Sequence, residues 1–233
     1  MQRLSTLALS FRLVQRGFVT SSPSPNNLPP VLNNRFFGMR HGNSLANQAC
    51  IISSDPAVAT VSHGLSPLGI EQANTSAAAF VASHTSSAPL DCVVVSSDFT
   101  RARMTAEILL CTLQSAGLAS LSSSVRLSTS LRERSFGDLD GGPDTEYSKV
   151  WDLDSSDSSH DAYKVEPVDS VVCRTTELIR CLDGEGAGKV IFLVAHGDVL
   201  QILQTAFKGV EGSKHRSLQH LETAEVREFS LEK

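Results

Sequence analysis

The sequence predicts an α/β fold, a three-layer α-β-α sandwich built around a mainly parallel β-sheet. Short apolar runs of strand length alternate along the chain with longer segments of helical periodicity. Strands that alternate with helices in this way form a parallel sheet covered by helices on both faces. The chain has 233 residues, of which 41% are hydrophobic and 19% charged, and this is enough for one such domain with a substantial core.

The expected strands are short and rich in Val, Ile and Phe. The strands at 36–39, 91–95 and 190–195 are each followed within a few residues by polar side chains that could carry chemistry. The strand at 125–127 leads into a further such segment. A last segment alternates apolar and polar residues, as an edge strand does. The strands are expected at residues 36–39, 91–95, 125–127 and 190–195, with the edge strand at 225–231.

The expected helices follow from apolar spacings of three and four residues. Ser66 as N-cap and Pro67 at the first helical position open a helix that continues to about Ser83. Asp169 is expected to cap a later helix. The other helices are expected at 102–113 (ending near residue 117), 172–182 and 198–207, and the stretch 137–168 as a loop with a short helix around Trp151.

The first 33 residues have a composition of their own. Apolar residues recur every three or four positions from Leu4 to Phe18, arginine and serine are frequent, and no acidic residue precedes Asp55. These features are typical of an organelle transit peptide, and the proline-rich segment 21–30 predicts a linker. We expect residues 1–33 to lie outside the fold and 34–233 to form the domain. Mitochondrial import is favoured, with a plastid or the cytoplasm as alternatives, or a disordered tail without a targeting role.

Charge and cysteine content limit the partners of the chain. It carries 20 basic and 25 acidic residues, with five arginines before the first acidic one, so the body is acidic. An acidic body argues against nucleic-acid binding, and the N-terminal apolar segment is too short to span a membrane. The five scattered cysteines predict reduced, mostly structural thiols. We therefore expect a small anionic ligand as partner, and the oligomeric state is not predicted.

Polar groups cluster where the expected strands end. His41-Gly42 follows the first strand and His196-Gly197 the last, Arg101 follows the second, and Glu133 follows the third. The carboxyl ends of parallel strands lie at one edge of a sheet, where open α/β sheets bind their ligands. A histidine can attack phosphorus, and guanidinium groups match phosphate oxygens. The set favours phosphoryl chemistry without a metal or other cofactor.

These motifs resemble the histidine phosphatase superfamily, branch 1, whose fold is phosphoglycerate-mutase-like. The resemblance is carried by Arg40-His41-Gly42, the stretch 63–73, the segment from Glu133 to Gly137, and His196-Gly197. It implies that His41 is the nucleophile that forms a phosphohistidine and that Glu133 donates a proton to the leaving alcohol. It further implies a phosphate pocket formed by Arg40, Asn47, Arg101 and His196, with His196 as the electrostatic partner of His41.

Within this superfamily the sequence favours a metal-independent phosphomonoester hydrolase that acts on a small phosphorylated metabolite. A mutase must shield its phosphohistidine from water with substantial lid segments, and only about sixty residues separate Glu133 from His196. A bisphosphoglycerate-dependent phosphoglycerate mutase is the alternative, and a catalytically silent scaffold is a third. Asn43 and the segment 166–170 depart from the family pattern. The segments 198–204 and 218–229 are similar to plant and protist phosphoglycerate-mutase-like proteins.

The other charged residues of these segments are expected to have supporting roles. Arg103 is expected to be structural, and the role of Arg134 is left open, with support of the catalytic groups as one interpretation. The spacing of His215 and His220 does not suit a metal pair, and the segment 215–218 is expected to close over the substrate. The remaining candidates, which we expect to be surface or capping histidines, are His63, His84 and His160.

Overall fold

The structure is a computed structural model that describes residues 28–84, 90–119 and 124–232. The transit-peptide prediction lies almost entirely outside these described residues. Leu28 and Leu32 pack against the hydrophobic core, and the backbone N–H of Asn33 donates to Asp183 at 2.8 Å. Residues 28–33 thus contact the body although they precede the predicted boundary.

One five-stranded sheet forms the centre of the protein, in the order β3-β2-β4-β1-β5. The first four strands in this order are parallel to one another, and β5, which the sequence predicts as an edge strand, lies at the edge and runs antiparallel to β1. The central strand β4 is buried along almost its whole length, which explains its unbroken apolar sequence. The strands are β1 (Arg35–Arg40), β2 (Asp91–Ser96), β3 (Arg126–Leu127), β4 (Lys189–Ala195) and β5 (Val226–Phe229).

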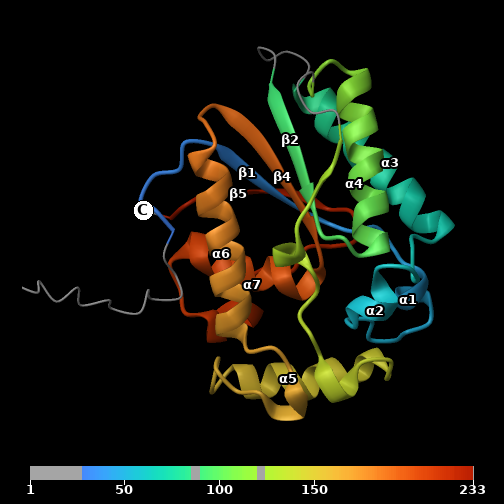
Figure 1. Ribbon diagram of the computed structural model, residues 1–233, viewed down its shortest axis with the longest axis vertical. Helices are drawn as coiled ribbons and strands as arrows, with labels where there is room; N and C mark the ends of the chain where they lie inside the picture. Colours follow the sequence, from blue (N-terminus) through green and yellow to red (C-terminus); the bar gives the residue numbers. More distant parts are fainter. Residues whose placement is uncertain (1–27, 85–89, 120–123, 233) are drawn as a thin grey trace, which may run out of the picture.

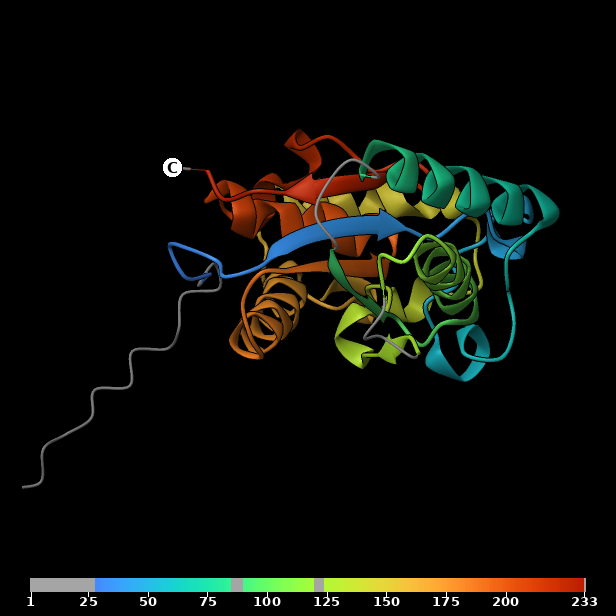
Figure 2. The same cartoon turned by 90° about the horizontal axis from the view of Figure 1, so that it is seen from above.

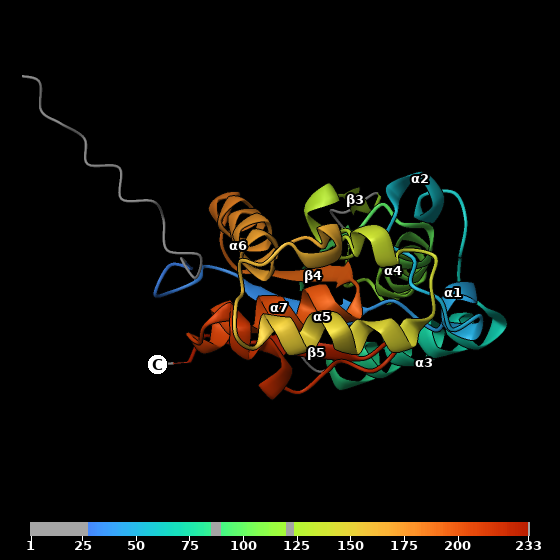
Figure 3. The ribbon, with the colours of Figure 1, turned by 90° about the horizontal axis from the view of Figure 1, so that it is seen from below.

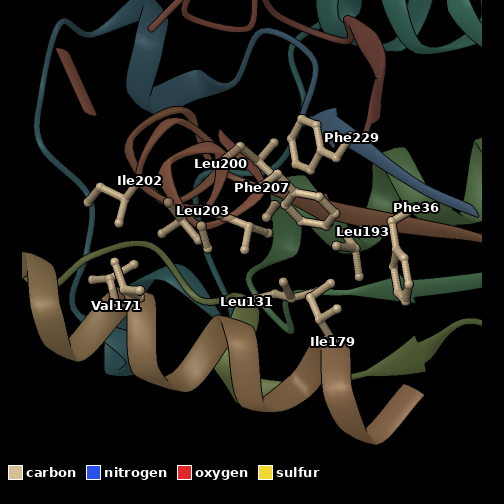
Figure 4. Packing of buried hydrophobic residues seen from close by; sticks show 14 of the residues in the cluster. Phe36, Leu131, Val171, Ile179, Leu193, Leu200, Ile202, Leu203, Phe207 and Phe229 are labelled. Carbon is tan, nitrogen blue, oxygen red and sulfur yellow. The ribbon is translucent and has the colours of Figure 1, made fainter. Parts of the chain in front are cut away.

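Helices cover both faces of the sheet, so the predicted three-layer architecture is confirmed (Figures 1 and 2). The helices α3 (Pro67–His84) and α4 (Thr100–Ser115) pack on one face, and α6 (Val168–Gly184) and α7 (Gly197–Lys208) on the other. Side chains of each strand alternate between the two cores: Phe36 points to the α6–α7 side and Phe37 to the α3–α4 side. Figure 4 shows the first of these cores, where residues of α6 and α7 meet the sheet.

Shorter elements lie at the carboxyl end of the strands. They include α1 (Leu45–Gln48), α2 (Pro56–Ala59) and α5 (Tyr147–Asp154), and Figure 3 shows α5 crossing this end of the molecule. The predicted short helix around Trp151 is thus confirmed as α5. The sequence did not predict α1 and α2, because four residues are too few to show a helical period.

Two further predictions need correction. Asp169 does not cap α6: the helix begins at Val168 after Pro167, and Asp169 lies in its first turn. All five cysteines are free, as expected, but only Cys92 is buried, so the other thiols are not part of the core. Within the described ranges, every helix is too short or too polar to cross a membrane.

A contact between two glycines fixes the loop that carries the first His-Gly pair. A Cβ atom on Gly42 would lie 2.4 Å from the carbonyl oxygen of Gly69, and one on Gly69 would lie 2.0 Å from that of Asn43. The start of α3 therefore packs directly on the backbone after β1, and only glycine permits this approach. This accounts for Gly42 and Gly69, which lie in two of the segments that carry the family resemblance.

Gly69→Ala is therefore expected to destabilise the fold by at least about 2 kcal/mol, because the added methyl group must displace backbone rather than a flexible side chain. Urea unfolding measures the change in the free energy of unfolding. Gly184→Ala is the matched control, since a Cβ there meets nothing within 4 Å. Equal stability of the two variants would contradict the role assigned to this contact.

Candidate active site

A cavity of about 200 Å³ opens at the carboxyl end of the sheet. Five of the six residues predicted for the site line it, and the sixth, His196, lies directly behind His41. The register explains the convergence, because Arg40 at the end of β1 pairs with Ala195 at the end of β4. The five lining residues are Arg40, His41, Asn47, Arg101 and Glu133.

The hydrogen bonds of His41 fix its tautomer. Its Nδ1 lies 2.8 Å from the carbonyl oxygen of Gly42, and the Nε of Arg101 donates to its Nε2 at 3.1 Å. A guanidinium can only donate, so Nε2 is the unprotonated nitrogen and Nδ1 carries the proton. Burial and the charges of Arg101 and Arg40 hold the pKa of His41 well below its ordinary value. His41 therefore presents a neutral ring with a lone pair in the pocket.

Arg101 is held by the segment that follows α1. Its Nη2 donates to the carbonyl oxygen of Ser53 at 2.8 Å, and its Nη1 lies 3.4 Å from the Ser53 hydroxyl. That hydroxyl is also 2.8 Å from Nδ1 of His63. His63 is half-buried and supports the arginine through Ser53, so its prediction as a surface or capping residue is wrong.

Arg40 is positioned by His220, which the sequence analysis did not place in the site. Its Nη1 donates to Nε2 of His220 at 2.7 Å and to the carbonyl oxygen of Leu221 at 3.0 Å. Burial and the charge of Arg40 lower the pKa of His220, so the ring is a neutral acceptor. Gly197 permits this packing, because a Cβ there would lie 2.8 Å from Cε1 of His220. Gly197 of the second His-Gly pair thus makes room for His220 and for Arg40 at the end of β1.

His196 supports His41 from behind the cavity wall. The centres of the two rings are 5.1 Å apart in an edge-to-face arrangement, and His196 is fully buried. Its Nε2 lies 3.0 Å from the hydroxyl of Ser97, whereas its Nδ1 is buried with no hydrogen-bond partner among the described residues. Burial and the nearby Arg101 hold its pKa well below the ordinary value, so the ring is neutral.

Asn47 caps a helix and borders the pocket at once. Its Oδ1 accepts from the backbone N–H of Ser44 at 3.0 Å, and the Ser44 hydroxyl accepts from the Asn47 N–H, which together form a capping box for α1. The Nδ2 amide of Asn47 makes no hydrogen bond to any residue that the structure describes. It is therefore available as a donor to a ligand.

Glu133 is suited to hold a proton near neutral pH. Burial and the nearby carboxylate of Asp198 raise its pKa to about 7, against the opposing effect of Arg101. Its Oε1 accepts the backbone N–H of Arg134 at 3.0 Å, which fixes the carboxyl group at the pocket wall. A carboxyl group with this pKa can act as an acid and then as a base in one cycle.

A wall of the pocket comes from residues that the sequence analysis did not select. Asp144, Tyr147 and Trp151 line it from the segment that contains α5, and Asp198 lines it from the start of α7. The Tyr147 and Trp151 rings stack with their centres 5.3 Å apart, and Nε1 of Trp151 donates to Asp198 at 3.0 Å. The spacing of Tyr147 and Trp151, four residues on one helix, was the only sequence signal for this wall.

Behind this wall lies a buried ionic network centred on Arg134, whose role the sequence left open. Arg134 is fully buried and forms two hydrogen bonds of 2.7 Å with Asp154, and its Nη1 lies 3.4 Å from Asp198. His160 also contacts Asp154, at 2.7 Å, and its side chain is only 10% exposed. His160 is therefore a network residue rather than a surface histidine, while His84 bonds to the last turn of α3 as expected.

Arg134→Ala is expected to lower the free energy of unfolding by about 3–5 kcal/mol, because it leaves the buried carboxylate of Asp154 without its counter-charge. Arg126→Ala is the matched control: its pair with Glu185 is exposed and is expected to contribute less than about 1 kcal/mol. Denaturant titration of both variants measures the difference. Similar losses in the two would contradict the structural role of Arg134.

The segment 215–218 lies beside the wall formed by Asp144, Tyr147, Trp151 and Asp198. The guanidinium carbon of Arg216 is 3.8 Å from the centre of the Trp151 ring, whereas His215 is fully buried and packs under the segment. The segment therefore supports the pocket wall in this structure. No group of three or more His, Cys, Asp or Glu side chains within the described ranges is placed to hold a metal ion.

Comparisons with known proteins agree with this geometry. The sequence profile of the histidine phosphatase superfamily (branch 1) matches residues 36–233. The chain therefore belongs to this superfamily. A search of curated proteins found no match.

Solved structures of phosphatases share the fold. A mycobacterial glucosyl-3-phosphoglycerate phosphatase is 25% identical, with 83% of this chain and 88% of that chain covered and a TM-score of 0.64. The same enzyme in complex with VO3 gives 24% identity, coverage of 83% and 91%, and a TM-score of 0.66. A mutant of the phosphoserine phosphatase of Entamoeba histolytica, in complex with phosphoserine, is 21% identical, with coverage of 84% and 89% and a TM-score of 0.65.

Proposed function

We propose that the protein is a phosphomonoester hydrolase that acts through a phosphohistidine on a small phosphorylated metabolite. The observation that carries this proposal is the pocket itself: an unprotonated Nε2 of His41, the guanidinium groups of Arg40 and Arg101, and a carboxyl group with a pKa of about 7 face one cavity. Membership of the superfamily and the phosphatase neighbours support the same reaction.

In the first step Nε2 of His41 attacks phosphorus. The N–P bond forms as the ester P–O bond breaks, and Glu133 gives its proton to the departing alkoxide, so that a neutral alcohol leaves. Arg101, whose Nε–H occupies the lone pair in the free protein, moves its hydrogen bond to a phosphoryl oxygen. Arg40 and Arg101 then stabilise the charge on the phosphoryl group as it is transferred.

In the second step water replaces the alcohol. Ionised Glu133 takes a proton from the water as its oxygen attacks phosphorus, the N–P bond breaks, and phosphate leaves with His41 neutral again. The carboxyl group ends the cycle protonated, as it began. A pKa near 7 allows both transfers at neutral pH.

The test is hydrolysis of an aryl phosphate in the presence of EDTA, together with trapping of the phosphoenzyme by a rapid quench that avoids acid. The proposal expects phosphate release and a label on His41. A scaffold would give neither product. Interconversion of 2- and 3-phosphoglycerate after priming with a bisphosphoglycerate, without net phosphate release, would instead identify a mutase.

We also propose that residues 1–33 direct the protein to the mitochondrion, with a plastid as the alternative destination. The support is the arginine- and serine-rich, acid-free composition of this segment. Fusion of residues 1–33 to a fluorescent reporter tests the proposal. A diffuse cytosolic signal would refute import.

A further inference from the structure

The pocket has a second part beyond the groups that handle the phosphoryl group, and its chemistry restricts the substrate. We infer, on the basis of the proposed function, that the substrate is the monophosphate of an alcohol that carries hydrogen-bond donors and no second anionic group, as a polyol monophosphate does. The inference rests on the charges and free acceptors of the lining residues.

The two cations that line the pocket are both used in binding one phosphoryl group. Arg40 and Arg101 are the only basic side chains among the described lining residues that carry a positive charge, and both lie beside His41. His220 is neutral because it accepts a hydrogen bond from Arg40. A phosphoryl group with two negative charges uses both guanidinium groups, so a second anion on the substrate would find no lining cation left.

The wall formed by Asp144, Tyr147, Trp151 and Asp198 is acidic and offers unused hydrogen-bonding groups. The Asp144 carboxylate has no hydrogen bond or ion pair to any residue in the described part of the chain, and the same holds for the Tyr147 hydroxyl. Asp198 adds to this wall a second carboxylate, which also accepts from Trp151 and lies 3.4 Å from Arg134. Hydroxyl groups of a substrate would find acceptors here, whereas a carboxylate or a second phosphate would meet like charges.

Asp144 is held in place by the backbone rather than by its side chain. Its N–H donates to the carbonyl oxygen of Cys50 at 2.9 Å, and Pro143 and Ile51 form an antiparallel bridge. The backbone of Asp144 is therefore fixed at the cavity, and its carboxylate, which has no partner among the described residues, stays within reach of a ligand that enters. A like charge at this position disfavours an anionic ligand relative to a neutral one.

The basic residues near this wall are already engaged. Arg216 packs on the Trp151 ring and donates to Gln201, and Lys149 pairs with Glu146. Arg134 is buried in its pair with Asp154. None of these three lines the cavity, so none is placed to neutralise a second anion there.

Two ligands with the same carbon skeleton test the inference. Glycerol 3-phosphate and 3-phosphoglycerate differ only in a terminal hydroxymethyl group against a carboxylate. Calorimetric titration of the full chain carrying His41→Ala measures binding without turnover. We expect glycerol 3-phosphate to bind at least about tenfold more tightly, because the carboxylate of the other ligand faces Asp144 and Asp198.

The role of Asp144 is tested in the same background. Asp144→Asn keeps the shape of the side chain and removes its charge. The ratio of the affinities for glycerol 3-phosphate and 3-phosphoglycerate is therefore expected to fall about threefold or more. Asp152→Asn, on the exposed side of α5 and outside the cavity, makes the same charge change and should leave the preference unaltered.

Three results would overturn the inference: equal affinity for the two ligands, tighter binding of 3-phosphoglycerate, or binding of neither. Hydrolysis of an aryl phosphate by the unaltered chain is measured separately. If that hydrolysis is absent while the binding preference is found, the proposed function fails and the assigned ligand class stands. If hydrolysis is present and the binding preference is absent, the inferred ligand class fails and the proposed function stands.

Discussion

His41→Ala is expected to lower kcat by about 10⁴-fold or more, and it is one of the two substitutions with the largest predicted effects on activity. The reason is the chemistry of its Nε2, since no other nitrogen lone pair in the described site is directed into the cavity beside both arginines. Nε2 of His220 accepts a hydrogen bond from Arg40. Nε2 of His196 lies 3.0 Å from the Ser97 hydroxyl, and His196 does not line the cavity. Neither ring can take over the attack.

The measurement is steady-state hydrolysis of an aryl phosphate, with phosphoenzyme trapping in parallel. His84→Ala is the matched control, because this histidine lies at the end of α3, does not line the cavity, and bonds only to its own helix. Far-UV circular dichroism of both variants checks the fold. Full activity of His41→Ala in a folded protein would exclude the phosphohistidine mechanism.

The architecture could be predicted from the sequence because apolar residues are distributed differently in the central strands and in the long helices. β4 is apolar almost throughout, while α6 and α7 each present one apolar face, so the two kinds of element are easily distinguished. The start of α6 was misplaced because Asp169 looks like a cap, whereas Pro167 already determines where the helix begins. Local composition alone does not settle such a choice between neighbouring residues.

The convergence of the candidate site residues on one cavity was predictable for a related reason. These residues lie at or after the ends of parallel strands, and the order of parallel strands brings their carboxyl ends to one edge whatever the rest of the chain does. Arg40 ends β1, His41 follows it, and His196 follows β4, which is hydrogen-bonded to β1. His196 packs against the His41 ring with 5.1 Å between the ring centres, and its role as the electrostatic partner of His41 stays a prediction.

The outer wall could not be predicted, because it depends on tertiary contacts between distant segments. Asp144 reaches the pocket through backbone pairing with residues near Ile51, and Trp151 through its hydrogen bond to Asp198. Neither contact leaves a periodic signal in the sequence. This is also why the substrate class that we infer rests on the structure and not on the motifs.

Glu133→Gln is expected to lower kcat for alkyl phosphates by about 10²–10⁴-fold and to have a much smaller effect on aryl phosphates with good leaving groups. The amide keeps the shape of the side chain and loses the transferable proton. An alkoxide needs that proton to leave, whereas a nitrophenolate leaves without it. A similar loss for both kinds of substrate would assign Glu133 a role in binding rather than in proton transfer.

The pH dependence separates these roles further. Burial and Asp198 raise the pKa of Glu133 to about 7, so the protonated form that serves the departing alcohol is present below this pH and is lost as the pH rises through it. Where ester cleavage limits the rate, kcat for an alkyl phosphate should be level at lower pH and fall about tenfold per unit above 7. In Glu133→Gln this fall should vanish, because no group remains to titrate. Its persistence in the variant would place the controlling proton on another residue of the site.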